Sequence, residues 1–189
     1  TMTIARGLAL FITGGAIISG FPEAFDNLGV GFVANVPIPV VLMAIIVAIG
    51  WIVLSKTEFG LNVYALGGNE KAAKLAGLKT SSIQMKTYII SAFLASFGGI
   101  LMTSRVASAQ PNLMTSTNLD VIAAVVVGGT SMKGGSGSMF NTILGSILMA
   151  SLFNGLNIIG IGYEWQQVII GVIIAVAVSV DMLSKRKMA

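Results

Sequence analysis

The sequence predicts an all-α, polytopic bundle of transmembrane helices, and three observations support this fold class. Of the 189 residues, 55% are hydrophobic and 10% are charged, and the mean hydropathy is +0.92. Soluble domains carry roughly 25% charged residues, because their surface is wetted by water. The apolar residues also gather into runs close to bilayer length, separated by polar or glycine-bearing stretches.

About six membrane segments are expected, and the fourth of them is broken. The apolar stretches cover residues 4–19, 38–54, 87–104, 121–127, 139–160 and 164–183. The fourth is far shorter than a spanning helix and follows ASAQPNLMTSTN, which holds a proline and several hydroxyl or amide side chains. Irregular backbone at membrane depth survives only against protein or a wet cavity. We therefore expect a broken helix that is packed inside the bundle.

Composition also excludes several kinds of function. The chain has no cysteine and no histidine, which removes disulfides, thiol nucleophiles, imidazole bases and the usual zinc or haem ligands. We expect no cofactor, no metal and no catalytic residue. The net charge of +4 does not indicate a nucleic-acid partner, because the basic residues lie between apolar spans.

The first 18 residues lack the basic region and cleavage site of a signal peptide, so we expect the chain to begin within or just before a hydrophobic segment, as a fragment would.

Lysine and arginine predict the orientation. The 55–86 loop holds five lysines and the C-terminal SKRK run adds three basic residues, so both are expected in the cytoplasm. The 20–37 loop, a Gly/Pro-punctuated stretch whose charges are acidic, then faces outward. With the C-terminus inside, residues 128–138 are cytoplasmic and the fourth segment has to cross the membrane. Three aromatic residues fit as interface anchors: Trp51 on the inner side, Tyr163 and Trp165 on the outer side.

The glycine-rich stretch GGTSMKGGSGS, residues 128–138, raises the question of phosphate binding. A P-loop needs a lysine after a glycine, a hydroxyl residue after the lysine, and a preceding strand. Here Lys133 precedes Gly134 and the flanks are membrane segments. We expect a tight turn between the fourth and fifth segments, so an ATP-driven function would need a separate ATPase subunit.

A few polar residues lie within the apolar segments. Asp120 is interpreted as an N-cap of a helix beginning at Val121, with proton coupling as the alternative. The amides of Asn154, Asn157 and Gln166 either hydrogen-bond between helices or line a path for a hydroxylated solute. Two rows of small or packing residues predict close helix contacts: Ser91, Ala95 and Gly99, and Asn141, Gly145 and Met149.

A short capped helix is expected inside the cytoplasmic loop, within LGGNEKAAKLAGL (residues 66–78). Asn69 suits the N-cap, Glu70 suits the first turn, and Gly77 suits the left-handed position after the helix. One face carries Ala72, Leu75 and Ala76. On these residues alone, the segment is either an ordinary interfacial helix or a docking element for a cytoplasmic partner.

The stretch YALGGNEKAAKLAGL resembles the cytoplasmic loop in permease subunits of bacterial ABC importers for simple sugars, the ribose type. The resemblance continues through SAQPN, LDVIAAVVVGGTSMKGGSGS and NGLNIIG, and so covers nearly the whole chain in order. It implies that the chain is the C-terminal part of a permease of about ten spans. It also implies a coupling helix that fits a cleft on the ATP-binding subunit, formed by Asn69, Glu70, Lys71, Ala72, Ala73, Lys74, Leu75, Ala76, Gly77 and Leu78.

The resemblance further implies a single permease domain over residues 1–189, which moves a simple sugar such as ribose across the bacterial inner membrane. The implied partners are an ABC ATP-binding subunit that hydrolyses ATP, an extracytoplasmic sugar-binding protein, a second permease copy and the lipid bilayer. Three alternatives stay open: an ABC permease for branched-chain amino acids or another small solute, an ion-coupled secondary transporter, and a membrane scaffold.

Overall fold

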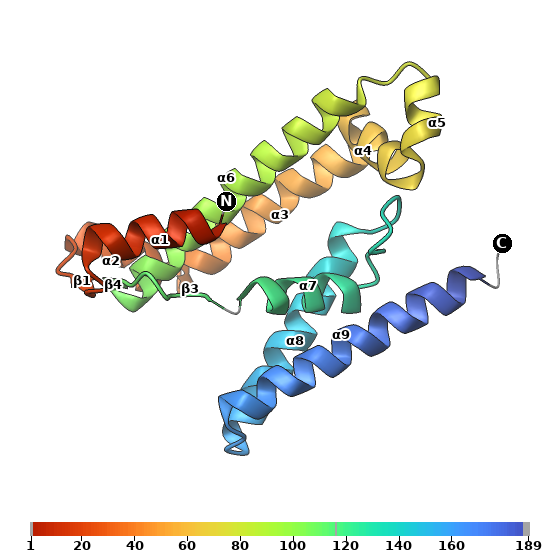
Figure 1. Cartoon of the computed structure of the whole chain (residues 1–189). Coiled ribbons are helices and arrows are strands. Elements are labelled where there is room, and N and C mark those ends of the chain that lie inside the picture. The colour runs from red at the N-terminus through yellow and green to blue at the C-terminus, as the bar shows by residue number, and fades with distance from the viewer. Residues whose placement is uncertain (1, 116, 187–189) are drawn as a thin grey trace. The chain divides into compact units, whose positions relative to one another are not determined.

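The computed structural model describes residues 2–115 and 117–186, and for residues 180–186 it describes the backbone alone. Its architecture is helical, as predicted (Figure 1). The described helices are α1 (Met2–Thr13), α2 (Glu23–Val30), α3 (Ile38–Lys56), α4 (Glu58–Gly68), α5 (Glu70–Leu75), α6 (Thr80–Val106), α7 (Thr117–Val127), α8 (Met139–Ile158) and α9 (Tyr163–Arg186). Lys187 of the predicted basic C-terminal run lies outside the described residues.

Each of the six expected membrane segments corresponds to a helix: α1, α3, α6, α7, α8 and α9. Among the described residues, α3, α6 and α8 are long and apolar enough to cross a membrane, whereas α7 has only 11 residues. These features confirm the polytopic all-α fold with a broken fourth segment. The first segment ends at Thr13 and not at residue 19, because Gly14 and Gly15 take positive φ angles of 60° and 77°.

The loops contain more regular structure than the sequence indicated. The 20–37 loop holds α2, whose first turn carries Glu23 and Asp26, where the helix dipole favours negative charge. Two short antiparallel ladders were also not expected. In the first, β1 (Ile18–Ser19) pairs with β4 (Ser108–Ala109); in the second, β2 (Phe32–Val33) pairs with β3 (Val36–Pro37).

The chain divides into two compact units, one made of residues 1–49 and 84–115 and the other of residues 50–83 and 116–189. In unit 1, α2 packs against the C-terminal end of α6. The hydroxyl of the buried Ser104 donates a hydrogen bond to the Phe25 carbonyl over 2.6 Å. A Cβ atom on Gly29 would collide with the backbone at Arg105. A glycine is therefore needed at residue 29 for this close approach.

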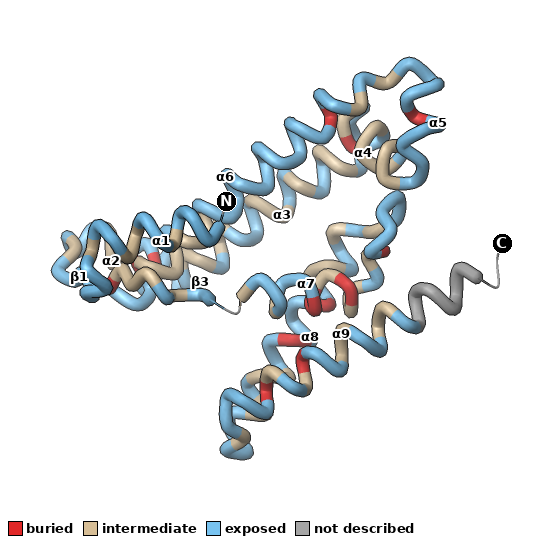
Figure 2. The backbone as a smooth tube through the Cα atoms, in the orientation of Figure 1, coloured by how far each residue is buried: buried red, intermediate tan, exposed pale blue. Residues whose placement is uncertain are grey.

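In unit 2, the core lies where α7 packs against α8 and α9. Its buried side chains are Ala123, Ala124, Met149 and Ile170. The buried positions of α7 are visible in Figure 2. The helical part of the broken fourth segment is thus packed against protein on one face, whereas Leu119, Val121 and Ile122 on α7 are exposed.

The two predicted packing rows differ in their burial. Gly145 and Met149 are buried on α8, and a Cβ atom on Gly145 would collide with the Ala124 carbonyl of α7. The row on α6 is not packed within the described chain, since Ser91 and Ala95 are exposed and a Cβ atom on Gly99 meets nothing within 4 Å. The packing prediction is confirmed at Gly145 and Met149 of the second row, and for the first row it stays a prediction.

We expect Gly145→Ala to destabilise unit 2 by about 1–3 kcal/mol, the usual cost of overpacking a tight contact. Gly155→Ala is the matched control on the same helix, because a Cβ atom there meets nothing within 4 Å and alanine is the better helix former. Thermal unfolding in detergent measures both variants. Equal midpoints for the two would contradict the close α7–α8 contact.

Candidate functional site

The short helix predicted within residues 66–78 forms as α5 (Glu70–Leu75), and its N-terminus is capped as expected. The Asn69 side-chain Oδ1 accepts a hydrogen bond from the Ala72 amide at 3.0 Å. Asn69 also ends α4, since its amide donates to the Ala65 carbonyl at 3.1 Å. One asparagine therefore both ends α4 and starts α5, so the two helices are joined without a flexible linker.

The C-terminus of α5 closes in a Schellman motif. The Gly77 amide donates to the Lys74 carbonyl and the Leu78 amide donates to the Ala73 carbonyl, each at 3.1 Å. Gly77 has φ +83°, a conformation that glycine adopts without strain. The predicted helix end is confirmed at Gly77.

The surface of α5 is divided between one buried and several open positions. Ala73 is 5% exposed and holds the helix against the protein, whereas Leu75 is 90% exposed. Ala72 and Ala76, on the same face as Leu75, are also exposed. A single large apolar side chain flanked by alanines is thus presented outward, which suits insertion into a groove of a partner.

The turn at residues 128–138 packs directly on α4. The Ser131 amide donates to the Ser136 carbonyl at 3.0 Å, which closes the predicted tight turn. The Tyr64 hydroxyl of α4 donates to the Gly137 carbonyl at 3.1 Å. A Cβ atom on Gly67 would lie 2.6 Å from the Gly135 amide nitrogen. The two loops predicted to share one side of the membrane are therefore in backbone contact.

Trp51 and Lys56, near the end of α3, also interact. The Lys56 ammonium lies 5.8 Å from the centroid of the Trp51 ring, within cation–π range. An aromatic ring with a lysine beside it is typical of the polar edge of a membrane. This pair fits the predicted interface position of Trp51.

The interpretation of Asp120 as an N-cap is wrong. Helix α7 begins at Thr117, four residues earlier than expected, and Asp120 lies in its first turn. Polar and acidic side chains are well tolerated there, because free amides and the helix dipole face them. Asp120 Oδ1 is buried, and it has no hydrogen-bond partner among the residues that the structure describes.

The three amides predicted for a solute path are only partly brought together. The buried Gln166 donates from Nε2 to Asn157 Oδ1 at 3.0 Å and to the Ile161 carbonyl at 2.9 Å. These bonds link the end of α8 to the start of α9, which is the hydrogen-bonding alternative considered for these residues. Asn154 lies exposed on α8, outside these hydrogen bonds. A role of these amides in transport stays a prediction.

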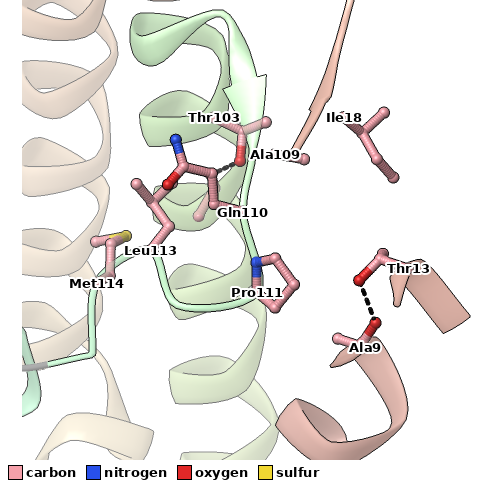
Figure 3. A pocket seen from close by; sticks show the side chains of 10 residues that line it. Ala9, Thr13, Ile18, Thr103, Ala109, Gln110, Pro111, Leu113 and Met114 are labelled. Atoms are coloured by element: carbon pink, nitrogen blue, oxygen red, sulfur yellow. Dashed lines mark hydrogen bonds between the residues drawn. The ribbon is translucent and has the colours of Figure 1, made fainter. Parts of the chain in front are cut away.

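Unit 1 contains a cavity of about 310 Å³ that was not predicted (Figure 3). Its walls come from α1, β1, α6 and the irregular segment after β4. Its polar side chains are Thr13, Thr103 and Gln110. The sequence could have indicated Gln110 as a site residue, because its amide lies in the polar stretch that breaks the fourth segment.

These features define a class of protein: a multi-pass membrane protein with a short, capped loop helix whose surface is exposed. Comparison with known families narrows the class. Residues 2–178 match the family model described as branched-chain amino acid transport system / permease component, and the chain belongs to this family. No solved structure matches the chain.

The similar proteins include sugar permeases. The chain is 41% identical over 183 residues to the ribose import permease protein RbsC of Bacillus subtilis (strain 168), an alignment that covers 96% of this chain and 57% of the relative. It is 38% identical to the galactose/methyl galactoside import permease protein MglC of Salmonella typhimurium, over 97% of this chain and 56% of the relative. It is 35% identical to the xylose transport system permease protein XylH of Haemophilus influenzae, over 82% of this chain and 41% of the relative.

The chain thus spans a little over half the length of the ribose permeases that it matches. The predicted resemblance to a ribose-type permease is confirmed.

We expect Gly135→Ala to loosen the contact between the 128–138 turn and α4. A Cβ atom there would lie 2.6 Å from Gly68 Cα, which forces the two backbones apart. Gly129→Ala is the matched control, because Gly129 has a similar φ of +83° but no atom within 4 Å of a Cβ. Hydrogen exchange of the C-terminal amides of α4 should be faster in Gly135→Ala alone. Equal exchange in both variants would contradict the contact.

Proposed function

We propose that this chain forms membrane-spanning segments of the permease of an ATP-driven ABC importer for a simple sugar, ribose or a close relative, in the bacterial inner membrane. The observation that carries the proposal is the match in order to ribose import permeases over 96% of the chain. The relatives named for xylose and galactose support a sugar as the solute class.

In this proposal the chain hydrolyses no ATP itself and receives energy through residues 69–78. Helix α5 docks into a cleft of an ATP-binding subunit, with Leu75 as its apolar anchor. The exposure of Leu75 and the double caps of α5 support this role, because a rigid helix loses little entropy on docking. The 55–86 and 128–138 loops and the C-terminus lie in the cytoplasm.

The remaining partners follow from the same proposal. An extracytoplasmic sugar-binding protein delivers the solute on the opposite side of the membrane. A second permease copy encloses the path. The low charge of the membrane segments supports a neutral solute, since an ion would need compensating charge along its way.

A permease for branched-chain amino acids is the closest alternative, and the description of the family model names this substrate class. The sugar relatives argue against it, as do the uncharged side chains that line the cavity of unit 1. An amino acid carries two charges that such a lining leaves unpaired. An ion-coupled transporter would leave the exposed, capped α5 without a role.

Uptake of labelled ribose tests the function. Cells that express the full transporter containing this chain, together with its ATPase and binding protein, should accumulate ribose and should not accumulate leucine. Accumulation should stop when ATP is depleted. Uptake of leucine without ribose would overturn the sugar assignment, and uptake that follows an ion gradient would overturn the ABC assignment.

We expect Leu75→Glu to abolish co-purification of the ATPase subunit with the intact transporter, because a carboxylate replaces the apolar anchor in the cleft. Leu61→Glu is the control: it puts the same charge on an exposed apolar residue of α4, in the same loop but outside residues 69–78. It should retain the ATPase. Retention of the ATPase by Leu75→Glu, with a wild-type yield of permease, would exclude docking through α5.

A further inference from the structure

We propose that the cavity of unit 1 is a binding subsite for an uncharged, hydroxylated solute, held by Gln110, Thr103 and Thr13. The assignment of a sugar rests on the proposed function, but the geometry of the site comes from the structure alone.

The cavity has the size and the walls of a small-molecule site. Its volume of about 310 Å³ is at the lower end of the usual range for ligand pockets, which suits a solute as small as a monosaccharide. Figure 3 shows Gln110 and Thr103 on one side of it and Thr13 and Ile18 on the other. Both α1 and α6 therefore contribute to its lining, together with the segment that follows β4.

The cavity is lined by the irregular part of the fourth membrane segment, and this position also supports a solute site. Helix α7 has 11 residues and is about 16 Å long, roughly half of the ~30 Å hydrocarbon core. The residues before it, from Ala107 on, have to supply the rest of the fourth segment. Irregular backbone at this depth is stable where it lines a cavity, and residues 109–111, 113 and 114 line this one. Transport sites commonly form at such breaks in membrane helices.

The backbone of this segment carries the conformational signs of a ligand site. Ala107 has φ +50° and Met114 has φ +63°, left-handed conformations that cost free energy for residues with a side chain. Such residues cluster at ligand sites, where the surrounding structure holds them in place. Between them, Ser108 and Ala109 pair with β1, which fixes the start of the segment against the strand that follows α1.

The polar groups suit a solute with several hydroxyls. The Thr13 hydroxyl donates to the Ala9 carbonyl at 2.8 Å, and the Thr103 hydroxyl donates to the Gly99 carbonyl at 2.9 Å. Each hydroxyl proton is therefore used within its own helix, and the Thr103 oxygen keeps its lone pairs to accept hydrogen bonds from a ligand. The Thr13 oxygen already accepts from the Gly15 amide at 3.2 Å, so it keeps one lone pair for a ligand.

Gln110 adds the complementary donor. Its Nε2 donates one hydrogen to Ser108 Oγ at 3.3 Å, so the second N–H and the carbonyl Oε1 remain to bind a ligand. Leu113 and Pro111 supply apolar surface for the C–H face of a sugar ring. No charged side chain is among the described residues that line the cavity, so an ionic solute would find no counter-charge there.

Two near-isosteric variants in the complete importer test the subsite: Gln110→Leu and Thr103→Val. Each removes hydrogen-bonding groups and preserves side-chain volume. Loss of one neutral hydrogen bond corresponds to roughly three- to tenfold weaker binding, so ribose uptake at sub-saturating concentration should fall by that factor. Co-purification of the ATPase should be unchanged, because the cavity belongs to unit 1 and α5 to unit 2.

Ser96→Ala is the matched control, because the Ser96 hydroxyl makes the same bond to the carbonyl four residues earlier, at 2.9 Å, but lies exposed outside the cavity. It should transport ribose at the wild-type rate. Wild-type uptake in both Gln110→Leu and Thr103→Val would overturn the subsite and indicate that lipid or another apolar segment fills the cavity. Absence of ribose uptake in the wild-type importer would instead overturn the proposed function.

Discussion

Backbone hydrogen bonding inside the bilayer is the constraint on which the other features of this chain depend. Hydrocarbon offers no partners for free amides and carbonyls, so the long apolar runs have to form helices. The fourth segment cannot satisfy this requirement alone, since only α7 is helical within it. The protein supplies the missing shelter in two ways: α8 and α9 bury one face of α7, with Ala123 fully buried at their contact, and β1 pairs with the backbone of β4.

The broken segment lies, along the chain, between the cavity proposed to bind solute and the turn that packs on α4, next to the proposed docking helix. Its N-terminal part, up to Met114, lines the cavity of unit 1, and its C-terminal end leads from α7 into the 128–138 turn, which packs on α4. A continuous helix would provide neither an irregular wall for a solute nor a sharp turn against α4. The proline and amides of SAQPN and the glycines of GGTSMKGGSGS are therefore the sequence features that make both parts of the segment possible.

Sequence reasoning succeeded where structure is determined locally and failed where it depends on contacts distant in the chain. The caps of α5 follow from hydrogen bonds within a few residues, so Asn69 and Gly77 were predictable. The six apolar segments follow from composition. Helix α2 was missed because its stability includes contacts with α6, such as the bond from Ser104 to Phe25 across 79 residues. The cavity was missed for the same reason, since its lining joins α1 to residues about 100 positions later.

The contact between α4 and the glycine turn gives a physical route from the proposed docking surface on α5 to the membrane segments. At Gly67, Gly134 and Gly135 the two backbones meet without intervening side chains, so neither can shift far without moving the other. Asn69 joins α4 to α5 directly, and the turn leads within a few residues into α8. A displacement of α5 by a partner would therefore reach α8 through backbone contacts, which deform less than flexible side chains. Such a rigid connection is what the proposed docking of an ATP-binding subunit on α5 requires, because the energy would have to enter as movement.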